Sequence, residues 1–327
     1  MTDQQGRPAA SAATDIREHR LIYGCMGLGG QWDRQPYGAR DIDDAHAAIE
    51  AALEIGITAF DHADIYRHGK SEAVFGEVLA RTPGLRARIL IQTKCGIHLP
   101  DDTAPGYYDL RATHIVRSVE QSLTRLRTDV IDVLLLHRPD PLADPEEIAG
   151  ALASLHRQGL VRHFGVSNMA AAQVAYLQAE LDLPLVANQL QLSLAHRDWL
   201  EAGVLVNTGE SAALGFPLGT LEHCRRNRIG VQAWGALAKG RFTGAQQSAA
   251  ERDTAERIAA LAHRAGTTPE TILLWWLQRH PARIVPVIGT ARPERIRACA
   301  DAVRRTPDLT HQQWYELWLA ARAEPLP

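Results

Sequence analysis

Short apolar runs alternate along the chain with longer amphipathic stretches. The runs are rich in β-branched and other apolar residues and are bounded by Gly, Pro, Asn or Asp, a pattern that predicts strands. The first run is "LIYGCMGLG" and the last run is "IVPVIGT". Eight strands are predicted, at 21–29, 58–66, 89–96, 131–140, 162–168, 184–193, 230–238 and 284–290.

The stretches between these runs have helical periodicity, and start signals support two of them. Thr113 stands before one apolar-periodic run, and Asp144 precedes Pro145, which suits the first turn of another helix. Strands that alternate with helices in this way predict a single-domain α/β fold, a (β/α)8 TIM barrel, with an open doubly wound sheet as the alternative. The predicted helices are 43–54, 71–81, 111–127, 145–158, 170–180, 217–227, 252–280 in two pieces and 292–304.

Three segments lie outside this alternation. Residues 1–19 are polar and Ala-rich and predict a flexible N-terminal tail, so the barrel domain is placed at 20–327. Residues 195–216 form a long loop that would overhang the catalytic face of a barrel. A C-terminal helix at about 310–322 is predicted from the capping-box spacing of Thr310 and Gln313.

Composition excludes several classes of protein. The chain has 46% hydrophobic and 22% charged residues and a formal net charge of -3, which predicts a globular protein with no attraction to nucleic acid or membrane. No apolar run reaches the roughly 18 residues of a membrane span. The 4 cysteines form no C-x-x-C pair, which favours a reducing, cytoplasmic location and argues against a zinc or disulfide framework.

Four chemically useful side chains close or follow consecutive predicted strands. Asp61 ends the second strand with Tyr66 in its loop, Lys94 ends the third, and His137 ends the fourth. Each has an ordinary structural interpretation as a turn, surface or core residue. In a barrel, however, the carboxyl ends of the strands form the active-site rim, so all four would lie together.

Together these groups could protonate a carbonyl oxygen. A phenol has a reference pKa near ~10, and a neighbouring ammonium such as Lys94 stabilises its anion and lowers that pKa. Asp61 would keep the lysine charged and oriented. An imidazole such as His137 can donate a hydrogen bond to a substrate oxygen while the phenol of Tyr66 passes it a proton.

The motifs "FDHADIY", "QTKCG", "LLLHRPD", "RHFGVSN", "NQLQLS" and "PVIGTARPERI" occur in an order and spacing that resemble the aldo-keto reductases, over about residues 20–305. This resemblance implies a (β/α)8 barrel, a nicotinamide cofactor bound without a Rossmann fold, and reversible reduction of an aldehyde or ketone. It also implies that the catalytic tetrad is Asp61, Tyr66, Lys94 and His137, with Tyr66 as the general acid.

The same resemblance implies a set of cofactor-binding residues. "GCMGLGGQW" fails the G-x-G-x-x-G pattern because Trp32 stands where the third glycine should be, so Gly27 is interpreted as a first-strand glycine that a ligand approaches. Trp234 would stack on the nicotinamide, and Thr290 and Arg295 would contact the adenosine phosphate. The remaining predicted contacts are Ser167, Asn168 and Gln189 around the carboxamide, and Gly235, Leu237 and Lys239.

Some positions depart from the family pattern. Gly289 stands where many relatives have a lysine, and Cys299 stands where many have an asparagine, so two of the usual phosphate or adenine contacts are missing. NADPH is still predicted over NADH. Gly235 and Ala236 replace a common Ser-Pro pair. Trp32, Trp199 and one of Tyr107 or Tyr108 are predicted as walls of a pocket for an apolar or aromatic carbonyl compound. The oligomeric state is not predicted.

Two alternatives compete with the reductase hypothesis. Asp61, His62, Asp64 and His68 lie close in sequence and suggest a metal-dependent hydrolase on the same barrel, although they have no second ligand cluster to join. A protein that binds the nicotinamide cofactor and senses its redox state, with little turnover, is the other alternative. No metal is predicted as a cofactor.

Overall fold

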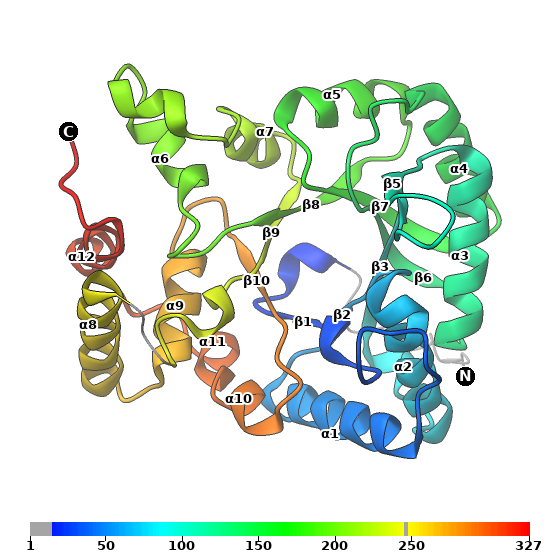
Figure 1. Ribbon diagram of the computed structural model, residues 1–327, viewed down its shortest axis with the longest axis horizontal. Helices are drawn as coiled ribbons and strands as arrows, with labels where there is room; N and C mark the ends of the chain where they lie inside the picture. Colours follow the sequence, from blue (N-terminus) through cyan, green and yellow to red (C-terminus); the bar gives the residue numbers. More distant parts are fainter. Residues whose placement is uncertain (1–14, 245–247) are drawn as a thin grey trace, which may run out of the picture.

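Eight parallel strands close into a barrel, as predicted. A computed structural model describes residues 15–244 and 248–327. Within them the strands follow chain order around the barrel, and β1 closes the ring by pairing with both β2 and β10 (Figure 1). The strands are β1 (Ile22–Gly24), β2 (Ala59–Asp61), β3 (Leu90–Cys95), β6 (Ile131–Leu136), β7 (Val161–Ser167), β8 (Leu185–Gln191), β9 (Gly230–Trp234) and β10 (Val285–Ile288).

Helices surround the barrel on its outer side, and most lie where their periodicity predicted them. Asp144 caps α4 with Pro145 in its first turn, and Thr310 and Gln313 form the capping box of α12. Thr113 does not begin its helix; Arg111 is the N-cap. The helices are α1 (Ala39–Ile55), α2 (Lys70–Arg81), α3 (Ala112–Leu126), α4 (Pro145–Arg157), α5 (Ala171–Glu180), α6 (Asp198–Val204), α7 (Thr220–Arg226), α8 (Ala249–Ala265), α9 (Pro269–Gln278), α10 (Pro293–Arg297), α11 (Ala300–Arg304) and α12 (His311–Arg322).

The apolar core has two layers. One fills the space between strands and helices, and the other fills the barrel interior with small and branched side chains such as Ile22, Leu90 and Val133. Ile16, in a short 3-10 helix (Ile16–Glu18), joins the interior layer. The prediction of a flexible tail over residues 1–19 therefore extends too far toward the barrel, because Ile16 is buried. Residues 1–14 lie outside the described residues.

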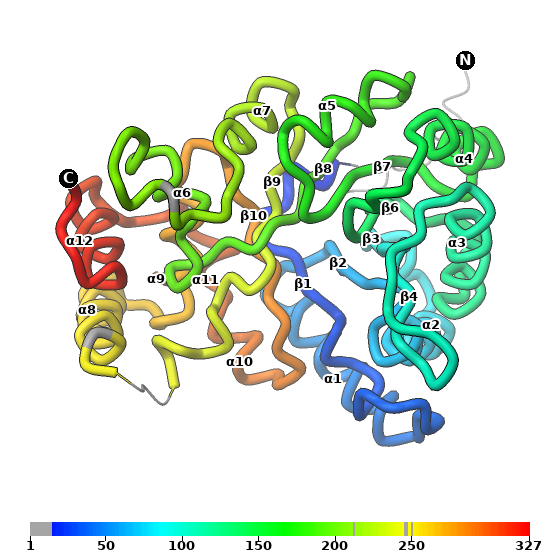
Figure 2. Tube along the Cα trace, turned by 45° about the horizontal axis from the view of Figure 1, so that its top comes forward, coloured from blue at the N-terminus to red at the C-terminus, as the bar shows by residue number. Residues whose placement is uncertain are grey.

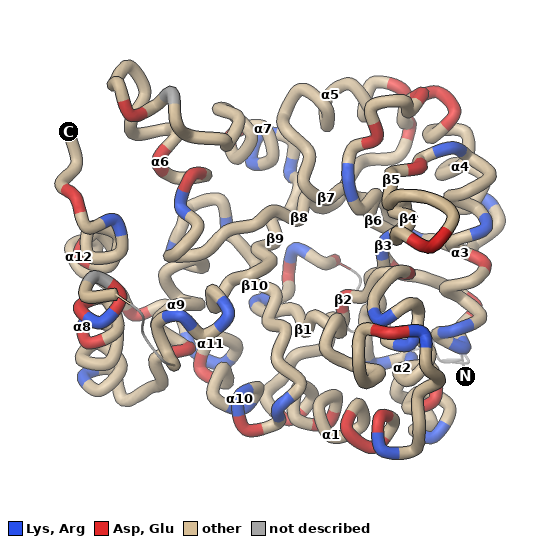
Figure 3. The backbone as a smooth tube through the Cα atoms, in the orientation of Figure 1, with Lys and Arg blue, Asp and Glu red and all other residues tan. Residues whose placement is uncertain are grey.

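Charged residues are spread over the helices and loops, with both signs interspersed (Figure 3). The four cysteines are buried and free of disulfides. No helix in the described part of the chain is both long and apolar enough to span a membrane.

The connection 195–216 is more ordered than its sequence predicted, because it contains α6 and a short 3-10 helix (Gly209–Ala213). It packs against the C-terminal helix: Trp318 Nε1 donates to Glu201 Oε1 at 3.1 Å. Figure 2 shows α6 next to α12 at one side of the molecule.

A small antiparallel hairpin, β4 (Ile97–His98) with β5 (Tyr107–Tyr108), follows β3 and was not predicted. It lies over the side of the barrel covered by α2 and α3 (Figure 2).

Candidate active site

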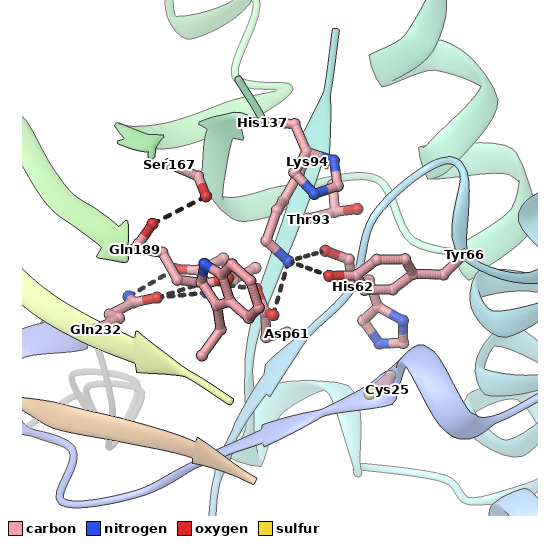
Figure 4. Close-up of polar contacts among 12 residues, drawn as sticks. Cys25, Asp61, His62, Tyr66, Thr93, Lys94, His137, Ser167, Gln189 and Gln232 are labelled. Atoms are coloured by element: carbon pink, nitrogen blue, oxygen red, sulfur yellow. Dashed lines mark hydrogen bonds and ion pairs between the residues drawn. The ribbon is translucent and has the colours of Figure 1, made fainter. Parts of the chain in front are cut away.

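The ammonium of Lys94 is the centre of the polar cluster at the barrel rim. Its Nζ lies 2.7 Å from Asp61 Oδ2, 3.0 Å from the Tyr66 hydroxyl and 2.8 Å from the carbonyl oxygen of His62 (Figure 4). The side chains of Lys94 and Asp61 are 1% and 3% exposed. A buried ammonium with three oxygen acceptors keeps its charge, because each of its three N–H groups has a partner.

Strand register brings these groups together. Asp61 pairs with Gln92 across β2 and β3, so Lys94, two residues further along β3, faces the same interior. Gln92 Nε2 donates to Asp61 Oδ1 at 2.6 Å while Lys94 holds Oδ2. Both carboxylate oxygens are therefore fixed by neighbours on the next strand.

Tyr66 begins a tight turn in the loop after β2. The next residues, Arg67 and His68, have φ values of 53° and 57°, in the left-handed region that residues other than glycine rarely adopt. Arg67 Nε donates to Met26 O at 3.2 Å, and its guanidinium lies 5.4 Å from the centre of the Trp32 ring. The turn is thus tied to the loop after β1, which fixes the direction of the phenol.

The charge states of the cluster follow from burial and neighbours. Burial opposes the charge of Lys94, but Asp61 and Tyr66 outweigh it and raise the pKa of the lysine. Burial also raises the pKa of Tyr66, and Lys94 acts in the opposite direction. The prediction that the pKa of the Tyr66 phenol is lowered is therefore wrong, because burial raises that pKa by more than the Lys94 ammonium lowers it. Tyr66 holds its proton at neutral pH and can give it away.

His137 stands beside this cluster at the end of β6. Its ring centre lies 6.0 Å from that of Tyr66, and its Nδ1 is buried with no hydrogen-bond partner among the described residues. Burial, then Lys94 and Arg138, hold the pKa of His137 well below its usual range. The imidazole is therefore neutral, with one N–H that can donate to an oxygen in the cavity.

A cavity of about 570 Å³ opens over the cluster. Lys94 and Gly27 do not line it. Lys94 contacts two lining residues, Asp61 and Tyr66, and Gly27 follows the lining residue Met26 in the chain. Most predicted site residues do line it: Asp61, Tyr66 and His137 of the cluster, Trp32 of the proposed pocket wall, and Ser167, Asn168, Gln189, Trp234, Gly235, Leu237, Lys239, Thr290 and Arg295 of the proposed cofactor site.

The wall formed by β7 to β9 is a hydrogen-bonded set of amide and hydroxyl groups. Trp234 Nε1 donates to Asn168 Oδ1 at 3.0 Å, and Asn168 Nδ2 donates to Ser167 Oγ at 2.7 Å. Gln189 Nε2 donates to Gln232 Oε1 at 2.9 Å. These contacts fix the indole edge of Trp234 and leave the ring as part of the cavity wall.

Sequence reasoning missed several members of the site. Gln232 and Gln92 exchange 2.9 Å hydrogen bonds and so connect the β9 wall to Asp61. Their strand positions could have indicated them, since Gln92 lies two residues before Lys94 and shares its face. Arg138 and Glu270 also line the cavity; neither sits in a pattern that distinguishes it from a surface charge.

At the far end of the cavity the protein leaves basic groups open. The side chains of Lys239 and Arg295 have no hydrogen bond or ion pair with any residue in the described ranges. The guanidinium of Arg295 lies near the backbone next to Lys239, because a Cβ on Gly240 would stand 3.8 Å from Arg295 Nη2. Two unpaired cations beside the start of α10 can hold a phosphate.

Two predicted pocket walls lie elsewhere. Trp199 is 4% exposed and its ring packs 5.7 Å from that of Trp276, because α6 folds back onto α9 and α12. Tyr107 does not line the cavity; it stacks on His98 in the β4–β5 hairpin, with ring centres 4.3 Å apart. Trp199 and Tyr107 are therefore corrected to packing residues.

The residues suggested for a metal-dependent hydrolase do not gather. Asp61 is bound by Lys94 and Gln92, and His62 is buried against Phe75 with ring centres 4.5 Å apart. His68 instead faces Trp32. Within the described ranges, no group of potential ligands forms around Asp61.

Comparisons with known proteins agree with this architecture. A sequence model of the aldo/keto reductase family matches residues 20–318. The oxidoreductase YdhF of Escherichia coli is 38% identical, covering 85% of this chain and 88% of its own. The 6-dehydroglucose reductase of Agrobacterium fabrum is 38% identical, covering 92% of this chain and 94% of its own.

A solved structure also superimposes over nearly the whole chain. It is the aldo/keto reductase of Klebsiella pneumoniae in complex with NADP and acetate, with a TM-score of 0.70 and 25% identity. The alignment covers 94% of this chain and 92% of that one.

Proposed function

The chain belongs to the aldo/keto reductase family, and from this membership and the geometry of the rim we propose that it is an NADP(H)-dependent oxidoreductase that reversibly reduces an aldehyde or ketone to an alcohol. The observation that carries the proposal is the contact of one buried ammonium, Lys94, with both Asp61 and Tyr66. That arrangement holds a protonated phenol at the wall of a cavity, which is what carbonyl reduction requires.

The cavity suits a nicotinamide dinucleotide. One end has the indole of Trp234 and the amides of Asn168 and Gln189, which suit a planar ring with a carboxamide. The other end has the unpaired cations Lys239 and Arg295, which suit phosphates. When bound, the nicotinamide supplies the hydride that reaches the carbonyl carbon.

The protein's own groups manage the charge on the substrate oxygen. Negative charge develops on that oxygen as its carbon is reduced, and Tyr66 donates its proton there. Lys94 stabilises the phenolate left behind, and Asp61 keeps the lysine oriented. Neutral His137 donates a hydrogen bond to the same oxygen and so polarises the carbonyl before reduction.

The preference for NADPH over NADH rests on Arg295 and Lys239. An unpaired guanidinium near the adenosine end favours a 2′-phosphate, and the similar Klebsiella pneumoniae protein was crystallised with NADP. Gly289 and Cys299 supply no charged group, so we expect a moderate preference.

The substrate wall combines apolar and polar groups. Met26, Trp32 and Ile65 line the cavity beside Tyr66, and Arg138 lines it beside His137. The apolar groups suit the aromatic or apolar carbonyl predicted from sequence. Because the Agrobacterium fabrum relative is named for 6-dehydroglucose, an oxidised hexose is the second substrate class to test.

The test has two stages. The purified protein is first titrated with NADPH and, separately, NADH, following tryptophan fluorescence, and we expect saturable binding of both with NADPH tighter. Turnover is then measured with aromatic aldehydes and with an oxidised hexose. Binding without turnover on any carbonyl would support the redox-sensor alternative, and absence of binding would refute the proposal.

A further inference from the structure

A second cavity, of about 640 Å³, lies on the other side of the Tyr66 loop. Its walls are the loop after β1 (33–37), the loop after β2 (64–70), the β4–β5 hairpin and one face of α3. Ile65 lines both cavities, so the loop that holds Tyr66 lies between them. No role proposed above uses this cavity.

The charges around this cavity do not cancel. Lys70 pairs with Asp33 at 2.8 Å, and Arg125 pairs with Glu72 at 2.8 Å. The guanidinium groups of Arg34 and Arg117 have no hydrogen bond or ion pair within the described part of the chain. Two guanidinium groups without an ion pair therefore remain at its rim, and one of them, Arg34, also acts on the nearby carboxylate of Asp101.

Imidazoles in the walls respond to these charges. Burial, then Arg34 and Lys70, lower the pKa of His68. Burial also lowers the pKa of His114; the nearby His98 and Arg117 act in the same direction, and Asp109 acts in the opposite one. The positive potential of Arg34 and Arg117 thus reaches the imidazoles of the cavity, where Asp33 and Asp109 offset part of it.

The acid inside the cavity does little to offset that potential. Burial, then Glu72, raise the pKa of Asp64 to about 7, so much of it is uncharged at neutral pH. Its Oδ1 is buried with no hydrogen-bond partner among the described residues.

A metal ion is the competing occupant, because ligand atoms of His98, Asp109 and His114 lie within 4.8 Å of one another. The carboxylate of Asp109 is already used: it accepts from Arg111 N, Nε and Nη2 at 3.1, 2.9 and 2.7 Å and contacts His98 Nε2 at 3.2 Å. Adjacent arginines also repel a dication. The cluster is better described as part of the basic wall.

We propose that this cavity binds a small organic anion carrying a phosphate or several carboxylates. The two unpaired guanidinium groups match oxyanions in geometry as well as charge. The imidazoles supply further donors, and the cavity is as large as the one proposed to bind the dinucleotide. This site does not rest on the proposed reaction, and its occupancy is measured without turnover.

Calorimetric titration with inorganic phosphate and with citrate, at constant ionic strength set by chloride, tests the proposal. We expect saturable binding of at least one probe, and the tighter one identifies the class of anion. In the double variant Arg34→Gln/Arg117→Gln, affinity should fall at least tenfold. Both arginines are exposed, so the variant should fold, and its Tm verifies this.

Two control variants make the result specific. Arg88→Gln/Arg226→Gln removes the same charge from exposed arginines that line neither cavity and should bind like wild type. Arg295→Ala should also retain binding. Loss of binding in either control, or no saturable binding by wild type, would overturn the proposal, because the anion would then sense net charge or occupy the dinucleotide cavity.

A proton NMR titration of the imidazoles gives an independent readout. A bound anion should raise the pKa of His68 and His114, with the signals assigned by single His→Asn variants. His46, exposed on α1, should not respond. Equal shifts at all three histidines would show a general salt effect and refute the site.

Discussion

The charged side chains at the two ends of the cavity beside Tyr66 differ in whether the protein itself pairs them. At the tetrad, Lys94 and Asp61 are buried and each has its partners inside the protein. At the other end, Lys239 and Arg295 have no partner within the described residues. The fold therefore completes the first site by itself and leaves the second to be completed by a ligand.

This difference has an energetic basis. Burying an ammonium and a carboxylate is costly unless excellent geometry and further hydrogen bonds compensate, so the ion pair of Lys94 and Asp61 is stable only with both members present. Cations at an open cavity keep much of their hydration and need no partner for folding. Substitutions at this ion pair should thus affect folding and catalysis, and substitutions of Lys239 or Arg295 should affect binding alone.

The largest expected effect is that of Lys94→Met. It removes the cation that pairs with Asp61 and leaves a buried carboxylate unpaired, which costs about 3–5 kcal/mol of unfolding free energy. Turnover should fall by ~10³-fold or more because Tyr66 loses the charge that stabilises its anion. Urea unfolding and steady-state assays measure the two losses.

The double variant Asp61→Asn/Lys94→Met separates these losses. With the buried carboxylate replaced by a neutral amide, most of the stability should return while turnover stays low. Recovery of turnover together with stability would contradict the role given to Lys94.

Tyr66→Phe should affect catalysis alone. The change removes a hydroxyl that accepts one bond from Lys94, which keeps Asp61 as its partner. Turnover should fall by about 10²- to 10⁴-fold, since the lost group acts on the transition state. The Tm and the NADPH dissociation constant should stay near wild type; unchanged turnover would refute the tetrad assignment.

Most of the barrel was predictable because strand and helix periodicities are local properties. The tetrad was predictable because its members end or follow three consecutive strands of the barrel, Asp61 with Tyr66, then Lys94, then His137. In a closed parallel barrel such positions must share one rim. The family motifs then supplied the roles proposed for them.

What the sequence did not predict depends on distant contacts. Trp199 is a core residue because Trp276 and His280, far along the chain, pack against its ring. The net pKa direction of Tyr66 depends on burial, which the spacing of Lys94 does not reveal. Ile16 is part of the core because its side chain packs against the residues of the barrel interior.

Arg295→Ala tests the far end of the cavity beside Tyr66, at which the basic side chains have no partner within the described residues. Loss of one charge-assisted contact to a 2′-phosphate costs about 1.5–3 kcal/mol, so the NADPH dissociation constant should rise by roughly 10- to 100-fold. NADH, which has no such phosphate, should bind with little change, and the Tm should not move. Fluorescence titration measures both cofactors; equal losses would show that Arg295 does not recognise the 2′-phosphate.

Gly289→Lys has the smallest expected effect and adds a charged group, whereas the other substitutions remove groups. A Cβ at Gly289 would meet no atom within 4 Å, and the residue lines the cavity, so a longer side chain fits without strain. A solvent-accessible ion pair contributes about 0.5–1 kcal/mol, which predicts two- to fivefold tighter NADPH binding that weakens in high salt. NADH affinity should change less. If the lysine instead left both affinities unchanged, the phosphates would lie beyond its reach, and the open end would comprise Lys239 and Arg295 without Gly289.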